Sequence, residues 1–425
     1  MRKKAFLLLC ALMLVLTTAA CGSKSTSTNG GTNSTSNGAK ETNVEKKETV
    51  EVTMAYWANA SEQKNFEFMI NGLEKEYPNI KVKMQMYPTS DEFWKAIPSA
   101  IAAGVGPDII AMSDEGNYEY IKKGVLAPLD ELITTVGFDK ERITSSLYKG
   151  WTDDNKLYGI PYDSSTSMLA INKAMYEKSG ITKLPETMDE VVELAKAMTT
   201  KDVKGIIGSI DPFHITQYVH AFGGDWGFGK TINSKENIAG VQFFVDLFLK
   251  HGVAIAPIEV GAPWDGEVFS QEKGAMSTAG PWYVGHLKEA NPNMQMIALP
   301  MPKGTVEAQS AYSHGLSVLA GSKHKEEAMQ VIKYALRDEA QLNAIEAVGY
   351  SPAVSSLLPN YLEKNPELKP VFDNMEKVGM PFAYPEQTKA FHADLLKGVE
   401  EIIFKKDGLT VEQLLNDLQS KYGEN

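Results

Sequence analysis

The chain has 425 residues, of which 43% are hydrophobic and 23% charged, and its formal net charge is -12 at pH 7. Such a length favours two domains, and such a composition is typical of a soluble globular protein rather than a fibrous or disordered one. The acidic charge argues against nucleic acid as a partner, because neutralising phosphates requires basic patches.

The first 20 residues are predicted to be a secretion signal. Residues 2–4 are basic, residues 5–16 form an apolar run, and the small residues 18–20 precede Cys21. The apolar run is too short for a comfortable membrane span. Removing residues 1–20 leaves 39 basic and 54 acidic residues, a formal charge of -15.

Cys21 is the one cysteine that would remain after cleavage, so no internal disulfide is expected. The segment resembles a bacterial lipoprotein signal, in which this cysteine is lipid-modified, although Thr18 stands where that pattern usually has an aliphatic residue. The alternative is an ordinary signal peptide. Residues 21–49 are polar and low in complexity, and they are predicted to form a flexible tether. Acyl chains on Cys21 would hold the protein at the outer face of the cell membrane.

The first half of the remaining chain alternates between strand and helix patterns. The expected elements are a strand at 51–57, a helix capped by Ser61 and continuing to Tyr77, a strand at 80–87, a helix at 93–103 and a buried strand at 107–112. This alternation predicts a parallel sheet covered on both faces.

The pattern restarts downstream, with helices expected at 188–198, 238–251 and 326–337 and strands at 167–171, 205–210 and 316–320. Two α/β domains of similar size are therefore predicted. Ligands in such sheets bind beyond the carboxyl ends of the strands, which nominates the loops at 59–62, 114–115 and 211–213.

Sequence motifs for catalysis or cofactors are not recognisable. The seven histidines show no zinc-ligand spacing, and the glycine-rich segment 223–230 matches neither a dinucleotide nor a phosphate-binding loop. We therefore predict no cofactor and no metal. The acid pairs Asp114-Glu115 and Asp153-Asp154 leave a surface glycosidase open as an alternative, although adjacent acids are more often a solvated turn.

Aromatic residues stand beside turn residues and acids at four places: Tyr162, Trp226, Trp264 and Trp282, the last followed by Tyr283. A sugar presents an apolar face that suits an aromatic ring, and hydroxyls that suit carboxylates and amides. A loop anchor packed into its own domain is the alternative for each ring singly. As a set, they indicate a carbohydrate site.

Five segments, taken in order, resemble the solute-binding lipoproteins of sugar ABC importers, of the maltose/maltodextrin-binding type. They are Met54-Ala55-Tyr56-Trp57; Ala102-Ala103-Gly104-Val105-Gly106-Pro107-Asp108-Ile109-Ile110; Leu157 to Tyr162 leading to Ile171-Asn172-Lys173; Ala279-Gly280-Pro281-Trp282; and Ala298-Leu299-Pro300. The resemblance covers nearly everything after the tether.

The resemblance implies roles for particular residues. Trp282 falls on the family's stacking tryptophan, Asp211 and Phe213 on an acid and an aromatic, and Glu115 on an acid that bonds sugar hydroxyls. The sequence departs from maltodextrin binders at Met112, at Ser165, at Ser61-Glu62 and at Phe391-His392, so the resemblance implies the scaffold and leaves the identity of the sugar open. The candidate ligand-binding residues are Trp57, Ser61, Glu62, Asp114, Glu115, Tyr162, Asp163, Ser165, Asp211, Phe213, Trp226, Trp264, Asp265, Trp282, Tyr283 and His392.

The implied fold is α/β, with two doubly wound lobes joined by a hinge of crossover strands, as in type II periplasmic binding proteins. The first lobe is expected to comprise 50–165 and 310–370, and the second 166–309 and 371–425. Crossings are expected near 164–167, 310–314 and 369–381. The implied protein is a monomer that closes on a sugar by hinge bending and presents it to ABC permease subunits. Another solute, an enzyme and a structural protein stay open as alternatives.

Overall fold

The computed structural model describes residues 48–58, 60–88, 90–405 and 408–423, without the side chains of residues 60, 61, 90 and 91. The predicted signal peptide, most of the tether and Cys21 lie outside the described residues. Residues 48–425 form a compact unit of their own. Among the described residues, no helix has the length and apolar character that crossing a membrane requires.

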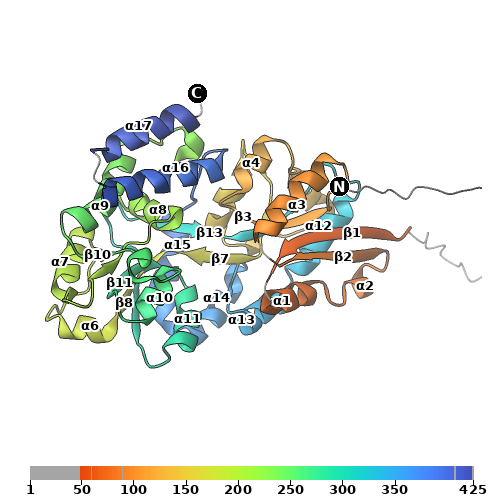
Figure 1. Ribbon diagram of the computed structural model, residues 1–425. Helices are drawn as coiled ribbons and strands as arrows, with labels where there is room; N and C mark the ends of the chain where they lie inside the picture. The colour runs from red at the N-terminus through yellow and green to blue at the C-terminus, as the bar shows by residue number, and fades with distance from the viewer. Residues whose placement is uncertain (1–47, 59, 89, 406–407, 424–425) are drawn as a thin grey trace, which may run out of the picture. The chain divides into compact units, whose positions relative to one another are not determined.

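The first lobe is built on a five-stranded sheet in the order β2-β1-β3-β14-β6, seen with β1 and β2 at the right of Figure 1. Its strands are β1 (Val50–Trp57), β2 (Ile80–Tyr87), β3 (Ile109–Ser113), β14 (His314–Val318) and β6 (Ile160–Pro161). The first three are parallel, as predicted, but β14 runs antiparallel to β3 and to β6. The predicted parallel pairing is therefore confirmed for the first three strands, and the antiparallel strand β14 is added where the chain re-enters this sheet from the other lobe.

Helices cover this sheet on both faces. They are α1 (Ala60–Ile70), α2 (Leu73–Glu76), α3 (Ser90–Ala102), α4 (Asn117–Lys122), α5 (Asp130–Val136), α12 (Lys325–Ala335) and α13 (Asp338–Ala347), with the 3-10 turns η1 (Lys140–Arg142) and η2 (Ser145–Trp151). The single helix expected from Ser61 to Tyr77 is broken at Gly72, whose φ of 84° is left-handed and cannot continue a helix.

The second lobe has its own five-stranded sheet, in the order β10-β9-β11-β8-β12. The strands are β8 (Met168–Asn172), β9 (Ile206–Ile207), β10 (Ala254–Ile255), β11 (Met276–Ala279) and β12 (Met296–Leu299). β9 is parallel to β10 and β11, whereas β8 is antiparallel to β11 and β12. The two lobes thus share one plan, a doubly wound sheet with antiparallel strands added beside the hinge.

The helices of the second lobe surround this sheet at the left of Figure 1. They are α6 (Lys173–Lys178), α7 (Met188–Met198), α8 (Pro212–Ala221), η3 (Gly227–Gly229), α9 (Lys235–Leu249), η4 (Pro257–Val260), α10 (Asp265–Ser270), α11 (Trp282–Ala290), α16 (Thr388–Glu400), η7 (Glu401–Lys405) and α17 (Val411–Tyr422). Helix α7 has the predicted bounds because Thr187 and Glu190 form a reciprocal capping box at its start.

A third sheet joins the lobes, in the order β15-β7-β13-β16. Its strands are β7 (Asp163–Thr166), β13 (Gln309–Tyr312), β15 (Ser351–Pro352) and β16 (Gly379–Met380), and a two-stranded hairpin, β4 (Thr152–Asp153) with β5 (Lys156–Leu157), lies apart from it. The first two crossings lie where they were expected. The third is longer, because η5 (Ser355–Leu357), α14 (Leu358–Lys364), η6 (Pro366–Leu368) and α15 (Lys369–Val378) precede β16.

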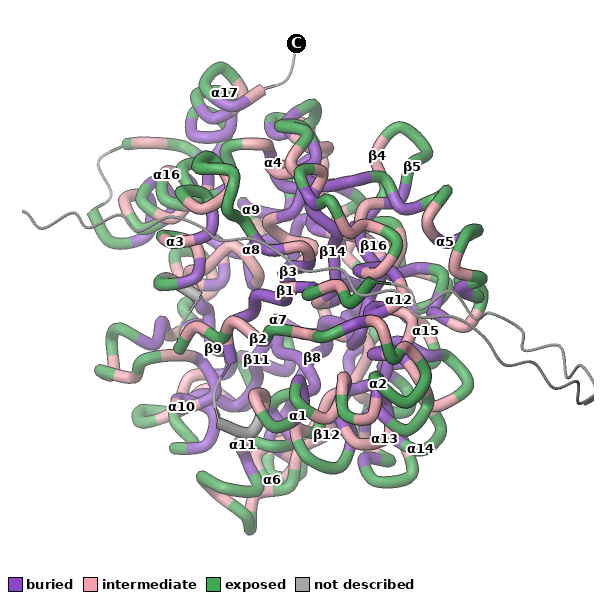
Figure 2. Tube along the Cα trace, turned by 90° about the vertical axis from the view of Figure 1, so that its right-hand side faces the viewer, coloured by how far each residue is buried: buried purple, intermediate pink, exposed green. Residues whose placement is uncertain are grey.

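The buried side chains form one cluster in the first lobe, one in the second, and a third that joins second-lobe residues to Ala311 of β13 and Ile345 of α13. Figure 2 shows buried residues along the central strands and exposed residues on the outer helices. Tyr361 and Leu368 pack with second-lobe residues such as Met168. These two residues precede the predicted boundary at residue 370, so α14 and η6 lie against the third cluster, while the exact boundary stays a prediction.

Candidate ligand-binding site

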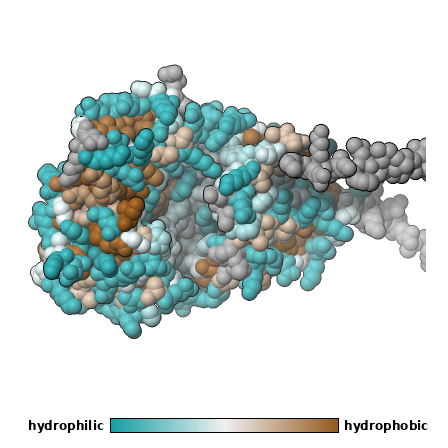
Figure 3. Space-filling view, viewed as in Figure 1, coloured by the Kyte–Doolittle hydropathy of each residue, from teal (hydrophilic) through white to brown (hydrophobic). Residues whose placement is uncertain are grey.

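The hinge strands form a polar floor between the two lobes. Ser165 Oγ of β7 donates to the hydroxyl of Tyr312 on β13 at 3.0 Å, and Ser164 Oγ lies 2.9 Å from Ser351 Oγ on β15. Figure 3 shows the molecule hollowed in the middle of the face above this floor. The floor thus presents hydroxyl groups to the space between the lobes.

An acid–histidine pair lies in this floor, with Asp163 buried and the His314 side chain 35% exposed. Asp163 accepts from the backbone N–H of His314 at 2.6 Å and pairs with its Nδ1 at 2.8 Å. The imidazole stacks on Tyr162 at 6.0 Å and meets the edge of Trp57 at 6.4 Å. Burial alone would lower the pKa of His314, but Asp163, Glu115 and Asp114 raise it to about 9. His314 is therefore a charged donor at neutral pH.

Two acids follow strand β3 and reach the same floor. Asp114 Oδ2 accepts from the backbone N–H of Ser313 at 3.1 Å, and burial, then Glu115, raises the pKa of Asp114 well above its usual value. Burial also raises the pKa of Glu115 to about 7, with His314 opposing the shift and Asp211 of the other lobe adding to it. The carboxylates of Glu115 and Asp211 therefore repel each other across the space between the lobes.

On the second-lobe side, Asp211 caps helix α8, which begins with a proline at its first position. Its carboxylate accepts from the backbone N–H of His214 at 3.0 Å and pairs with His214 Nδ1 at 2.5 Å. His214 Nε2 lies 3.1 Å from Asp265 Oδ2. Burial alone would lower the pKa of His214, but Asp211 and Asp265 raise it to about 10. The positive imidazolium fixes the orientation of Asp211.

This network gives two predicted site residues a structural role. Asp265 is 4% exposed and Tyr283 is fully buried, and Asp265 Oδ2 accepts from the Tyr283 hydroxyl and from Ser277 Oγ. Both side chains support His214 within the second lobe, and Asp265 also borders a pocket of about 610 Å³ with Asp211.

Trp282, in contrast, is 38% exposed at the start of helix α11. Its ring meets Phe213 edge-on at 5.2 Å, and Phe213 packs in turn on Tyr312 and Phe382. A Cβ atom placed on Gly280 would lie 2.0 Å from the Trp282 ring, so only glycine leaves room for the ring there. Gly280 thus leaves room for the Trp282 ring and Phe213 packs against it, so part of the ring stays exposed.

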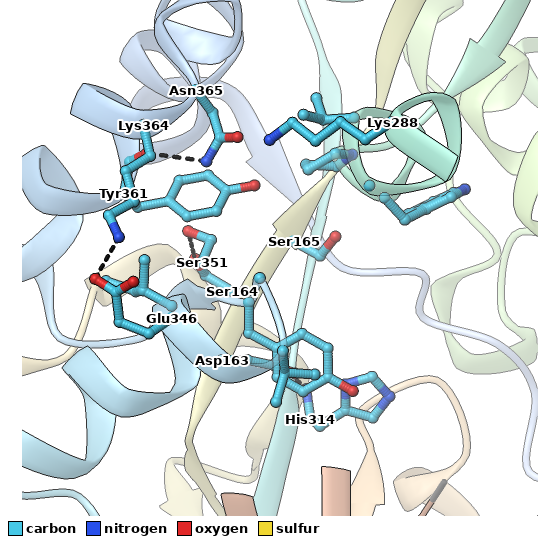
Figure 4. Close-up of a pocket in the computed structure, with 18 of the residues that line it drawn as sticks. Asp163, Ser164, Ser165, Lys288, His314, Glu346, Ser351, Tyr361, Lys364 and Asn365 are labelled. Carbon is cyan, nitrogen blue, oxygen red and sulfur yellow. Dashed lines mark hydrogen bonds and ion pairs between the residues drawn. The ribbon is translucent and has the colours of Figure 1, made fainter. Parts of the chain in front are cut away.

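Beside Trp282 lies a pocket of about 480 Å³, whose lining includes Asp163, Ser165, Tyr312 and His314. Figure 4 shows Asp163 and His314 at one end of this pocket and Ser165 facing its middle. Exposed ring, carboxylate and hydroxyls therefore meet in one concave space, the arrangement typical of a small-molecule site.

Other predicted residues occupy mixed positions. Trp57 and Glu62 are half-buried on the first lobe, where Glu62 accepts from the hydroxyl of Tyr350. Trp264 is half-buried over Gly266 and borders a separate pocket of about 610 Å³ with Asp211. His392 is half-buried with its ring edge-on to Tyr384. The side chain of Ser61 lies outside the described residues.

Trp226 corrects the sequence prediction most clearly. It is fully buried, its Nε1 donates to Thr216 Oγ1 at 2.8 Å, and its ring packs against Phe391 at 5.2 Å. Trp226 is therefore a core residue of the second lobe. The expectation that it stands exposed in a binding loop is wrong.

Two residues of the cleft, Tyr312 and His314, were nominated from the sequence only as part of a crossing. They carry no turn signal of their own, and strands β13 and β14 place them at the site. No group of three or more metal-ligating side chains occurs in the described part of the chain.

Comparison with known proteins agrees with this architecture. A model of the family described as bacterial extracellular solute-binding protein matches residues 57–342. The maltotriose-binding protein of Pyrococcus abyssi is 23% identical over 383 residues, covering 84% of this chain and 79% of that protein. The galactooligosaccharide-binding protein of Bacillus subtilis is 24% identical over 335 residues, covering 75% and 77%.

Among solved structures, the ABC substrate-binding protein of Listeria monocytogenes in complex with cycloalternan superposes with a TM-score of 0.75 at 21% identity. The match covers 88% of this chain and 98% of that one. At this identity the likeness shows the fold, and it confirms the predicted two-lobed α/β class.

Proposed function

Because the chain belongs to the bacterial extracellular solute-binding protein family, we propose that it binds a neutral oligosaccharide between its lobes and delivers it to the membrane subunits of an ABC importer. The family is one of solute-binding proteins rather than enzymes. The observation that carries the proposal is the exposed face of Trp282 beside Asp163, Ser165 and His314. An indole face suits the apolar face of a sugar, and the polar groups suit its hydroxyls.

The candidate ligand contacts come from both sides of the cleft. Trp57, Glu62 and Glu115 belong to the first lobe, and Asp211, Phe213 and Trp282 to the second, while Tyr162, Asp163 and Ser165 lie at the hinge. A sugar that touches both lobes binds the closed form better and shifts the population towards it. The closed form is then what the permease recognises.

The acids of this site favour a neutral ligand over an anionic one. Asp114, Glu115, Asp163 and Asp211 converge on the cleft, and the positive charge of His314 is already paired with Asp163. A phosphorylated solute would require cations to pair with it. The lysines that line the pocket, Lys288 and Lys364, lie away from its Asp163–His314 end, and Lys364 is paired with Glu346. Relatives named for maltotriose and galactooligosaccharide support the same ligand class.

The proposal is tested by thermal unfolding with a panel of mono- and oligosaccharides and one phosphorylated polyol. A ligand present at 100 times its Kd stabilises the native state by about 2.7 kcal/mol, which raises Tm by about 3 °C for a chain of this length. Trp282→Ala, which should raise Kd roughly 25-fold, should reduce the rise to about 1 °C, whereas Phe404→Ala, at an aromatic residue that is 44% exposed, should preserve it. An unchanged Tm with every sugar, or consumption of the sugar during the assay, would refute the proposed receptor function.

We also propose that Cys21 carries the lipid anchor and that the protein works as a monomer at the outer face of the membrane. Support for this comes from the sequence pattern of residues 2–21. Cys21→Ala should move the protein from the membrane fraction to the medium. Retention of the variant on the membrane would contradict acylation at this residue.

A further inference from the structure

One end of the cleft is bridged by aromatic rings from the two lobes. Tyr118 on α4 and Phe228 on η3 stack with centroids 4.1 Å apart and planes 29° apart. Tyr118 is 4% exposed. Beside this pair, Lys389 of α16 lies 6.0 Å from the ring of Trp94 on α3. Side chains from both lobes thus close this end.

The glycine-rich segment that matched no cofactor loop builds this bridge. Phe228 has φ 55° and ψ 33°, left-handed values that cost a non-glycine residue about 1 kcal/mol or more. It stands between Gly227 and Gly229, both also at positive φ, and its N–H donates to Ala383 O at 2.7 Å. The turn therefore places an aromatic residue at a position where glycine would adopt the backbone conformation without strain.

The opposite end of the cleft holds a pocket. Figures 1 and 2 both show α4 and α16 at the top of the molecule and α11, α13 and α14 at the bottom. The 480 Å³ pocket lies at this lower end, between α11 and the α13–α14 segment. In Figure 4, Lys288 extends from α11 towards Tyr361 and Asn365 on the other side. The volume of this pocket is within the range of small-ligand pockets, roughly 300 to 1,000 Å³.

This pocket is the one that Trp282 borders: its Asp163–His314 end belongs to the site described above, and its other end has walls from both lobes. At that other end, α11 of the second lobe faces Glu346 of α13 in the first. The 610 Å³ pocket beside Trp264 is lined by second-lobe residues. A sugar unit in the first pocket would therefore add to closure, and one in the second would not.

We propose that the cleft is a one-ended groove. The terminal unit of a linear, neutral oligosaccharide stops at the Tyr118–Phe228 pair, and the following units pass over Trp282 into the pocket between α11 and α13–α14. That pocket, rather than the one beside Trp264, sets the preference for chains over single sugars. This inference rests on the proposed function and specifies the ligand's direction and length.

The length preference is tested by filling each pocket in turn. Gly285 lines the lower pocket within α11, and a Cβ placed there meets nothing within 4 Å, so Gly285→Phe fills the pocket without a backbone clash. Gly321→Phe is the matched control, at an exposed glycine with equal room outside both pockets. Ala262→Phe fills the pocket beside Trp264.

The full chain and these variants are titrated by calorimetry with malto-, galacto- and manno-oligosaccharides of one to six units. Gly285→Phe should weaken binding of three units or more at least tenfold and leave the single sugar within twofold, while Gly321→Phe and Ala262→Phe change neither. A length-dependent loss in Ala262→Phe instead, or an equal loss at every length in Gly285→Phe, would overturn the proposal. Absence of sugar binding by the unaltered chain would refute the proposed function itself.

The direction is tested with the best-binding oligosaccharide carrying a bulky fluorophore at its reducing end or at its non-reducing end. One labelled form should bind within about threefold of the unlabelled sugar, and the other should lose at least a hundredfold. Phe228→Gly removes the blocking ring and suits the left-handed backbone. It should therefore raise the affinity for the rejected labelled sugar at least tenfold. Equal tolerance of both labels, or equal rejection, would overturn the one-ended groove.

Discussion

Gly280→Ala should displace the Trp282 ring, on which the sugar is proposed to stack, without substituting a residue that contacts the ligand. The added Cβ would lie 2.0 Å from the Trp282 ring, so the ring must leave its position. The 38% of Trp282 that is exposed corresponds to about 75 Å² of a side chain that buries roughly 200 Å² in full. At about 25 cal/mol per Å², covering this surface with a sugar contributes about 2 kcal/mol, or roughly 25-fold in Kd.

The assay is calorimetric titration of Gly280→Ala with the sugar that stabilises the unaltered protein. We expect Kd to rise roughly 25-fold, close to the effect of Trp282→Ala, and overpacking to reduce stability by about 1 to 3 kcal/mol. Gly321→Ala, with nothing within 4 Å of its Cβ, is the control and should keep the original Kd. Unchanged affinity in a folded Gly280→Ala protein would refute the role of Trp282 as platform.

Three further outcomes follow from the structure. Trp226→Ala removes a fully buried ring, so it should lower the unfolding free energy measured by denaturant titration by about 3 to 5 kcal/mol. The folded protein should keep its sugar affinity, and a weakened affinity would show that Trp226 contributes to the binding site. Since the folded-state pKa values of His314 and His214 are raised to about 9 and about 10, the stability from their charge is present below about pH 6.5 and is lost as pH rises through those values. Unfolding free energy should therefore fall from pH 6.5 to pH 9.5, and less steeply in His314→Gln; an unchanged slope in that variant would contradict the pairing of His314 with Asp163. Asp265→Asn should lower Tm, because the buried His214 loses a charged partner, and a Tm equal to that of the unaltered protein would show that this network carries no stability.

The elements predicted from local sequence signals each have a counterpart in the structure, although the short helices and strands between them were not predicted. The bounds of α7 and β2 agree with the sequence because a capping box starts the helix and strict alternation marks the strand. The antiparallel entry of β14 could not be predicted this way. Its direction depends on a chain crossing between lobes, which leaves no periodic pattern in β14 itself.

The candidate site was predicted in part. Trp226 and Trp282 both follow glycine-containing turns, yet Phe391, far away in the chain, buries Trp226, while Gly280 and Phe213 hold Trp282 open. Local sequence does not distinguish these outcomes, because burial is decided by tertiary neighbours. His314 was missed as a site residue since its function depends on Asp163, a partner 151 residues away.

Closure of the two lobes on a sugar is the central claim, and one distance measures it. Both cysteines of the chain lie at positions 10 and 21, so residues 48–425 accept a unique pair of spin labels at Val105→Cys in the first lobe and Leu249→Cys in the second. These side chains are 74% and 44% exposed. Pulsed electron resonance should show a longer, broader distance distribution without sugar and a shorter, narrower one at saturation. At a sugar concentration near the Kd of the unaltered protein, Trp282→Ala should show only a small part of that change. Sugar binding by calorimetry with an unchanged distance would contradict the account.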